Sequence, residues 1–129
     1  MILPDNYHMM DQLTDEWFAY KNGRVSSSHM SDVMAGGTGK TRTNYLYRLV
    51  AEKLSGKSAP TFSNKHMDRG VEDEPIAREQ YEFFNNVDVV EVGFIDHSEI
   101  ENYGASTDGL VGEHGLLEIK SALPAIHME

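Results

Sequence analysis

Residues 104–120 read Gly-Ala-Ser-Thr-Asp-Gly-Leu-Val-Gly-Glu-His-Gly-Leu-Leu-Glu-Ile-Lys and decide the fold of this 129-residue chain. Gly112 and Gly115 bound a segment that can form a hairpin turn, because glycine adopts the positive φ angles that tight reversals need. In the strand that follows, residues two apart project to the same face, so Glu118 and Lys120 should point together. The reversal would also bring Asp108 beside them. The stretch therefore predicts two carboxylates and one ammonium group at one site.

Two converging carboxylates offer the hard oxygen ligands that Mg²⁺ or Mn²⁺ prefers, and a nearby lysine can orient an attacking water. The pattern Asp-(x)n-Glu-x-Lys is only moderately specific, because an exposed Glu-x-Lys pair is more often an ordinary solvated strand edge. A third acid in suitable surroundings would favour the metal site.

That acid is expected in the stretch 67–84, where apolar residues recur at nearly helical spacing and predict an amphipathic helix. Pro75 lies inside this stretch and lacks a backbone N–H, so we expect a kink there or a helix that restarts near Glu74. A carboxylate at such a break can face a neighbouring sheet. The alternative is a solvated acidic face of the helix.

Several motifs occur in a fixed order along the chain. They are Trp17 with 23–28, the helix-like stretch 45–56, the run Arg69-Gly70-x-x-x-Glu74-x-x-Ala77-Arg78, the stretch Ala-Ser-Thr-Asp-Gly-Leu at 105–110, and Leu-Glu-Ile-Lys at 117–120. Together these motifs resemble the YqaJ-type viral recombinase family, the family of phage lambda exonuclease. The resemblance covers nearly the whole chain from about residue 14 onward.

The resemblance implies an α/β (α+β) fold with a PD-(D/E)XK nuclease core, in which helices flank a mixed central sheet. It implies an exonuclease that degrades linear double-stranded DNA from its ends to give single strands for phage-type recombination. Carried over residue by residue, Asp108 and Glu118 would bind Mg²⁺ or Mn²⁺, Lys120 would position the nucleophilic water, and Glu74 would complete the metal site.

Some family members grip a 5′-phosphate through a basic residue and serines. Lys21, Ser28 and Ser106 stand at the matching positions of this chain, and Arg24 is a second basic candidate. Lysine supplies a point charge and cannot make the two parallel hydrogen bonds of arginine. For the serines at 26–28, the alternative is a cap at the start of a helix over 27–35, and one serine can serve both purposes.

The chain departs from the family pattern in two places. Thr107 stands where the family usually has a proline before its first metal acid, and the chain stops at Glu129, before elements that family members carry after the Glu-x-Lys strand. We therefore expect a flexible N-terminal arm over 1–13 and a single nuclease domain over 14–129 that is truncated at its C-terminus. The alternative function is a non-catalytic module that binds DNA ends or serves recombination.

The net charge of −10, from 11 basic and 21 acidic residues, is unusual for a protein that binds duplex DNA. Divalent ions would offset some of the acids, and many basic residues fall in the first half of the chain. A ring-shaped homo-oligomer of the full-length protein could line its channel with that basic half. A single-strand annealing recombinase is the further partner that the resemblance implies.

The chain contains no cysteine, which fits a reducing cytoplasm and leaves oxygen ligands as the natural metal chemistry. No apolar run approaches the roughly 20 residues that cross a bilayer. We expect a protein with no membrane partner in the cytoplasm of a bacterium or a phage-infected host. A phosphate-binding loop at 36–41 is excluded, because Met34 stands where that motif requires its first glycine.

The element order predicted from hydrophobic pattern and turn residues is a run of helices followed by strands that carry the acids. The expected helices are 14–21, 27–35, 42–55 and 64–84, and the expected strands are 87–95, 101–107 and 115–121.

Overall fold

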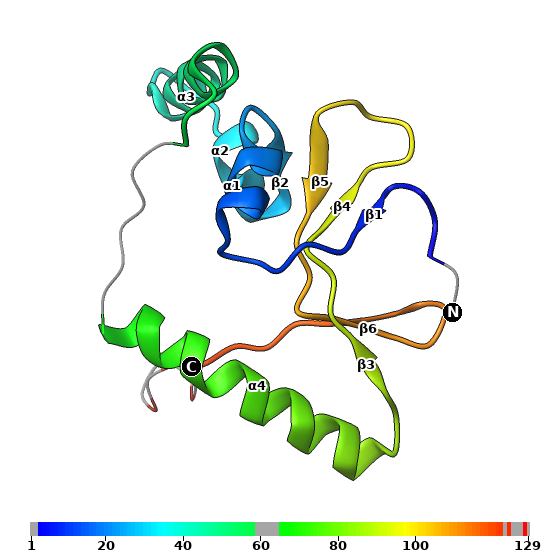
Figure 1. Ribbon diagram of the computed structural model, residues 1–129. Helices are drawn as coiled ribbons and strands as arrows, with labels where there is room; N and C mark the ends of the chain where they lie inside the picture. Colours follow the sequence, from blue (N-terminus) through cyan, green and yellow to red (C-terminus); the bar gives the residue numbers. More distant parts are fainter. Residues whose placement is uncertain (1–2, 59–64, 123, 125–127, 129) are drawn as a thin grey trace. The chain divides into compact units, whose positions relative to one another are not determined.

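The computed structural model describes residues 3–58, 65–122, 124 and 128 (Figure 1). Their contacts divide them into two compact units. Unit 1 comprises residues 1–60 and 92–107, and unit 2 comprises residues 61–91 and 108–129. No helix in these described ranges combines the length and the apolar character that crossing a membrane requires.

Unit 1 contains a mixed four-stranded sheet, with strand order β1-β4-β5-β2. Strand β2 pairs in parallel with β5, whereas β1 with β4 and β4 with β5 are antiparallel. The elements are β1 (Tyr7–His8), α1 (Asp15–Lys21), β2 (Val25–Ser26), the 3₁₀ turn η1 (Ser27–His29), α2 (Met30–Val33), α3 (Thr41–Ser55), β4 (Phe94–Asp96) and β5 (Tyr103–Ala105). The expected mixed sheet accompanied by helices is confirmed in this unit.

The core of unit 1 forms around Phe94, which is completely buried. Trp17, Tyr45 and Val92 are also buried. A side chain at Gly104 would collide with the ring of Phe94, so β5 passes directly against this ring and requires a residue without a Cβ. Aromatic burial of this kind is the main source of stability that a small sheet can obtain.

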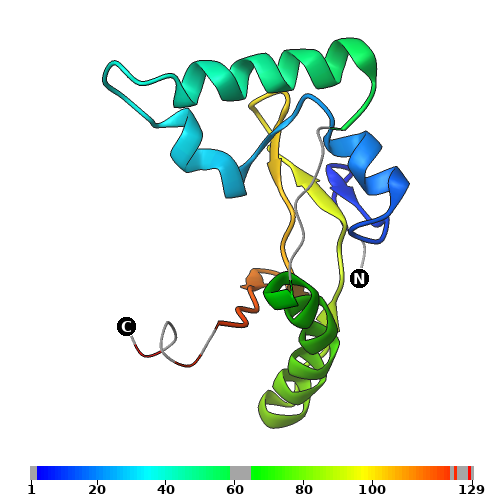
Figure 2. The ribbon, with the colours of Figure 1, turned by 90° about the vertical axis from the view of Figure 1, so that its left-hand side faces the viewer.

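Unit 2 contains the antiparallel sheet β3-β6-β7 and the long helix α4. These elements are α4 (Lys65–Asn85), β3 (Val89–Val90), β6 (Gly109–Val111) and β7 (Gly115–Leu117). In Figure 2, α4 is the lower green helix, drawn in front of part of the orange β6–β7 hairpin. Val111 pairs with Gly115 across the turn, and Gly112 has a φ of +62°, which only glycine adopts without strain. The predicted hairpin turn is confirmed.

Helix α4 confirms the predicted helix 64–84, but the helix does not restart near Glu74, and a kink at Pro75 stays a prediction. The helix runs without interruption from Lys65 to Asn85. Val71, whose carbonyl the proline leaves without a helical donor, is exposed, as is Pro75 itself. Water can therefore satisfy that carbonyl, which removes the main reason for the helix to end there.

The predicted strands were too long, and three strands, β1, β2 and β6, were not predicted. The stretch 87–95 forms two short strands, β3 and β4, while 101–107 and 115–121 shrink to β5 and β7. These unpredicted strands have two or three residues each, which is too short for an alternating pattern to be recognised. The expected helix 27–35 is split into η1 and α2.

The N-terminal segment also differs from the flexible arm expected over 1–13. Tyr7 and His8 form β1 and pair with Ile95 and Phe94. A side chain at Gly93 would collide with the carbonyl of Met10, so this segment also lies against the chain just before β4. This part of the arm therefore belongs to the sheet of unit 1.

Candidate active site

Asp108 immediately precedes β6 and is held against the end of β7. Its backbone N–H donates to the carbonyl of Leu117 at 3.1 Å, and its carboxylate Oδ2 accepts from the N–H of Ile119 at 2.7 Å. The following residue, Gly109, cannot carry a side chain because a Cβ there would collide with Val89 of β3. The reversal thus brings Asp108 beside the Glu118-Ile119-Lys120 segment, as the sequence predicts.

Glu118 and Lys120 lie just beyond the end of β7, not on a longer strand as expected. Their side chains nevertheless point together, with Lys120 Nζ 3.8 Å from Glu118 Oε2. Both side chains are exposed, at 52% for Glu118 and 82% for Lys120. Such an exposed ion pair contributes little to stability. Both groups therefore remain accessible to a ligand.

Glu74 lies on α4 and is tied to Asp108 through Arg78, one helical turn further along. Arg78 Nη2 is 2.6 Å from Glu74 Oε1, and Arg78 Nε and Nη2 each donate to the main-chain carbonyl of Asp108 at 3.2 Å. Burial raises the pKa of Glu74, and the negative charge of Asp108 raises it further, whereas Arg78 lowers it. Glu74 and Asp108 are therefore within electrostatic range of each other.

The donor chemistry of these residues fits a divalent cation. The candidate ligands are carboxylate oxygens, and the charge of Asp108 disfavours the ionised form of Glu74, an effect that a nearby cation would relieve. Within the residues that the structure describes, however, no group of three or more His, Cys, Asp or Glu side chains is close enough to hold a metal ion. That Glu74, Asp108 and Glu118 bind one ion together stays a prediction.

The phosphate-binding candidates all lie in unit 1, where Trp17 contacts two of them. Lys21 Nζ lies 3.9 Å from the centre of the Trp17 ring. Trp17 Nε1 donates to Ser106 Oγ at 3.1 Å and to the carbonyl of Gly93. Ser106 Oγ donates to the same carbonyl of Gly93 at 2.8 Å. Burial lowers the pKa of Lys21, and the positive charge of Arg48 lowers it further. Lys21 and Ser106 thus share one neighbour.

Ser28 is exposed and does not cap a helix. Its hydroxyl lies 3.1 Å from that of Ser26, and neither η1 nor α2 has a side-chain hydrogen bond at its cap residue, Ser26 or His29. Of these serines, Ser26 stands at the N-cap position of η1, but its side chain makes no capping hydrogen bond. A role of Ser28 in binding phosphate stays a prediction.

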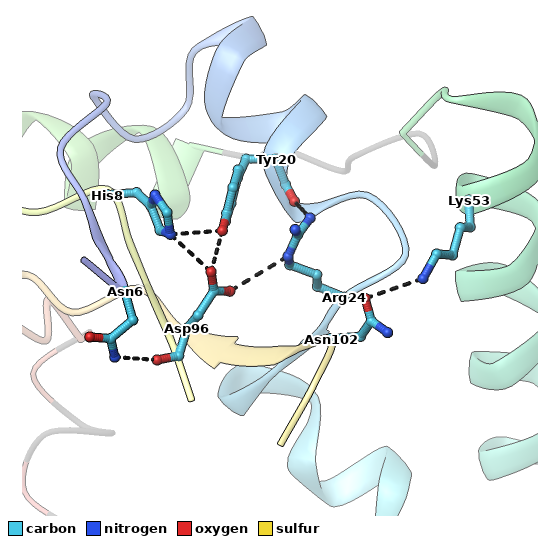
Figure 3. A network of polar contacts seen from close by, with 7 residues as sticks. All are labelled: Asn6, His8, Tyr20, Arg24, Lys53, Asp96 and Asn102. Carbon is cyan, nitrogen blue, oxygen red and sulfur yellow. Dashed lines mark hydrogen bonds and ion pairs between the residues drawn. The ribbon is translucent and has the colours of Figure 1, made fainter. Parts of the chain in front are cut away.

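Arg24 is engaged with protein groups around Asp96, as Figure 3 shows. Its Nε is 3.5 Å from Asp96 Oδ1, its Nη1 donates to the carbonyl of Tyr20, and its guanidinium lies 4.0 Å from the centre of the Tyr20 ring. Asp96 Oδ2 also contacts His8 Nε2, at 2.9 Å, and the Tyr20 hydroxyl. Arg24 is therefore less available for a phosphate than Lys21.

Sequence reasoning did not identify the roles of Arg78 and Asp96. Arg78 entered only as part of a motif, although its spacing of four from Glu74 is the spacing at which helical side chains form ion pairs. Asp96 lies just beyond the predicted strand 87–95 and was given no role. Its partners His8 and Tyr20 are 88 and 76 residues away in sequence, so no local pattern could have indicated the cluster.

Comparison with known families agrees with this geometry. A family model described as the YqaJ-like viral recombinase domain matches residues 16–129. The chain belongs to this family. The match includes all eight candidate site residues, so the YqaJ-like assignment covers both the acids of unit 2 and the basic and serine residues of unit 1.

Two solved structures are similar to the chain. They are an alkaline exonuclease, LHK-Exo, from Laribacter hongkongensis, and LHK-Exo in complex with dAMP. Each has 43% sequence identity and a TM-score of 0.79, over 89% of this chain and 57% of the other. This likeness confirms the predicted PD-(D/E)XK-like α/β fold. The chain spans 57% of the length of LHK-Exo, and no curated protein matches it.

Proposed function

We propose that this chain carries the catalytic residues of a metal-dependent deoxyribonuclease that degrades linear double-stranded DNA from its ends. The observation that carries the proposal is the hydrogen bond from the N–H of Ile119 to the Asp108 carboxylate. This bond holds the centre of the Glu-x-Lys segment against Asp108. The family match and the similarity to an alkaline exonuclease support the same function.

In this proposal Asp108, Glu118 and Glu74 hold Mg²⁺ or Mn²⁺. When bound, the ion supplies an activated water and stabilises negative charge on the phosphodiester. Lys120 holds the attacking water, since its ammonium group is exposed and lies on the same side of the chain as Glu118. Arg78 takes up one oxygen of Glu74 and leaves the other for a ligand.

Lys21, Ser28 and Ser106 are proposed to bind the 5′-phosphate of the DNA end. Lys21 supplies the positive charge, and its contact with Trp17 limits the positions that its flexible side chain can take. Ser106 already donates to Gly93, so it would exchange that hydrogen bond for one to phosphate. Arg24 contributes to the positive field of this region while staying bound to Asp96.

The proposed setting is phage-type recombination, in which the single strands produced here pass to a single-strand annealing recombinase. A ring-shaped homo-oligomer of the full-length protein would allow a protein of net charge −10 to hold DNA, provided that the basic first half lines the channel. We also propose action in the cytoplasm of a bacterium or a phage-infected host, which the cysteine-free composition supports.

The test is to incubate the protein with 5′-phosphorylated linear duplex and with covalently closed circular duplex, with Mg²⁺ or with EDTA. Loss of the linear DNA alone, and only with Mg²⁺, is expected. The variant Asp108→Asn serves as a control for contaminating nucleases. Binding of linear DNA without cleavage in Mg²⁺ would contradict the proposal and favour a DNA-end-binding module.

A further inference from the structure

Arg78 is a buried arginine of α4 whose guanidinium group makes polar contacts with three residues. The residue is only 8% exposed. Its guanidinium bonds to Glu74 Oε1 at 2.6 Å, to the carbonyl of Asp108 at 3.2 Å through both Nε and Nη2, and to Glu91 Oε1 at 3.2 Å through Nη1. One planar group thus contacts helix α4, the residue before β6 and the residue after β3.

The contacts are placed so that the proposed ligand atoms stay available. Arg78 bonds to the main-chain carbonyl of Asp108, and the carboxylate of Asp108 is left to accept from Ile119. Only Oε1 of Glu74 is bonded to Arg78, and a carboxylate has a second oxygen with its own lone pairs. Arg78 can therefore fix where these two acids lie without replacing a metal ion.

We propose that Arg78 is a positioning residue of the metal site, which sets the separation of Glu74 and Asp108 through the shape of its guanidinium group. This inference rests on the proposed function, since it requires a metal ion at these acids. Groups that orient ligands in this way typically change metal affinity by about 10- to 100-fold when they are removed.

The charge and the shape of Arg78 have opposite effects on metal affinity. Its positive charge repels a cation, so removing the charge alone should strengthen metal binding. Its fixed fork of donors positions the acids, so removing the fork should weaken metal binding. Lysine keeps the charge and has a single ammonium group that cannot reproduce the fork. The substitution Arg78→Lys therefore separates the two effects.

The experiment is calorimetric titration of the metal-free protein with Mn²⁺, in the wild type, in Arg78→Lys and in Arg42→Lys. Arg42 is an exposed arginine that donates to the carbonyl of Ala35, so Arg42→Lys makes the same change of side chain at a residue with no proposed contact to the acids. We expect Arg78→Lys to weaken Mn²⁺ binding about 10-fold or more and Arg42→Lys to leave it unchanged. Wild-type affinity in Arg78→Lys would overturn the proposal.

The variant Asp108→Asn distinguishes this proposal from the proposed function. If the wild type binds Mn²⁺ and Asp108→Asn does not, the site exists, and the affinity of Arg78→Lys decides the role of Arg78 alone. If Asp108→Asn binds Mn²⁺ as the wild type does, the ion lies elsewhere and both proposals are overturned. Saturating Mn²⁺ should also restore cleavage in Arg78→Lys, which a loss of structure would not allow.

A second pair of variants keeps the test decisive if Arg78→Lys does not fold, as judged by thermal unfolding. Glu91 orients Nη1 of Arg78 and has a side chain that is 71% exposed, so Glu91→Gln should fold. Glu79 is exposed on α4 and provides the matched charge control Glu79→Gln. We expect Glu91→Gln to bind Mn²⁺ about threefold more weakly than Glu79→Gln. This effect is smaller than that of Arg78→Lys, because Glu91 acts on the acids only through Arg78. Equal affinities would overturn the proposal.

Discussion

The two units of this YqaJ-like chain differ in how contacts connect their candidate site residues. In unit 2, Asp108 and Glu74 are connected through one arginine, and Asp108 is bonded to the segment that carries Glu118 and Lys120. In unit 1, the phosphate candidates are distributed over separate contacts. Lys21 and Ser106 share Trp17, Ser28 bonds to Ser26, and Arg24 bonds to Asp96.

The difference teaches which groups remain available for chemistry. In unit 2, Arg78 is bonded to one carboxylate oxygen of Glu74 and to the main-chain carbonyl of Asp108, so it does not occupy the other carboxylate oxygens of these two acids. In unit 1, the hydroxyl proton of Ser106 and the guanidinium of Arg24 are already used within the protein. We therefore expect substitutions in unit 2 to affect cleavage most, and substitutions in unit 1 to affect substrate preference or stability.

The largest effect is expected for Glu118→Ala and Lys120→Ala, which should each reduce the rate of DNA cleavage about 1,000-fold or more. The fold should be retained, because both side chains are exposed and their ion pair adds little stability. Single-turnover cleavage of linear duplex measures the effect. Glu113→Gln, in the exposed β6–β7 turn, is the control. Full activity in both alanine variants would remove these residues from the mechanism.

A smaller effect is expected on the preference for a 5′-phosphate. Lys21→Ala should reduce the ratio of cleavage rates for phosphorylated and unphosphorylated ends about 10- to 100-fold, the range for one hydrogen bond to a charged group. Arg24→Ala should change this ratio much less, because Arg24 is bound to Asp96. Competition between the two substrates measures the ratio. A larger change in Arg24→Ala than in Lys21→Ala would reverse the comparison.

The Asp96 cluster should contribute to stability and not to cleavage. Asp96→Asn should lower the free energy of unfolding by about 2 kcal/mol, because the carboxylate accepts from Tyr20 and pairs with His8 and Arg24. Urea unfolding measures this change, and metal-dependent cleavage by the folded variant should stay near that of the wild type. An unchanged unfolding midpoint would show that the cluster is not stabilising.

The smallest effect concerns the pKa of Glu74 in the metal-free protein. Burial and the charge of Asp108 raise this pKa above its value in the unfolded chain. The folded state therefore loses stability as the pH rises through the pKa of Glu74 and the carboxyl group ionises. Asp108→Asn removes the charge and should lower the pKa toward its usual range. Titration of the carboxyl carbon by NMR measures the shift. A pKa that stays the same or rises would mean that the two acids do not interact.

The sequence predicts the long local features of this fold and misses those that depend on distant contacts. The helix 64–84 and the turn at 112–115 follow from periodicity and glycine placement, and both are observed. Strands of two or three residues carry too little pattern, so β1, β2 and β6 were missed. The uninterrupted helix at Pro75 depends on solvent exposure, which the sequence does not reveal.

The candidate site shows the same division. The spacing within 104–120 predicts that Asp108, Glu118 and Lys120 come together on one hairpin, because all three lie within 13 residues of each other. The contacts of Arg78 join α4 to Asp108, 30 residues further along the chain and just before β6, and to Glu91, just after β3. No spacing rule connects them, so only the three-dimensional structure identifies Arg78 as their common partner.

The most direct test of the central claim is where the protein binds Mn²⁺, measured by the broadening of amide signals in NMR spectra of ¹⁵N-labelled protein. Substoichiometric Mn²⁺ should broaden the signals of Asp108, Ile119 and Glu74 first, and Asp108→Asn should abolish this effect. Retention of these three signals while others broaden would contradict the assignment of the metal site to unit 2.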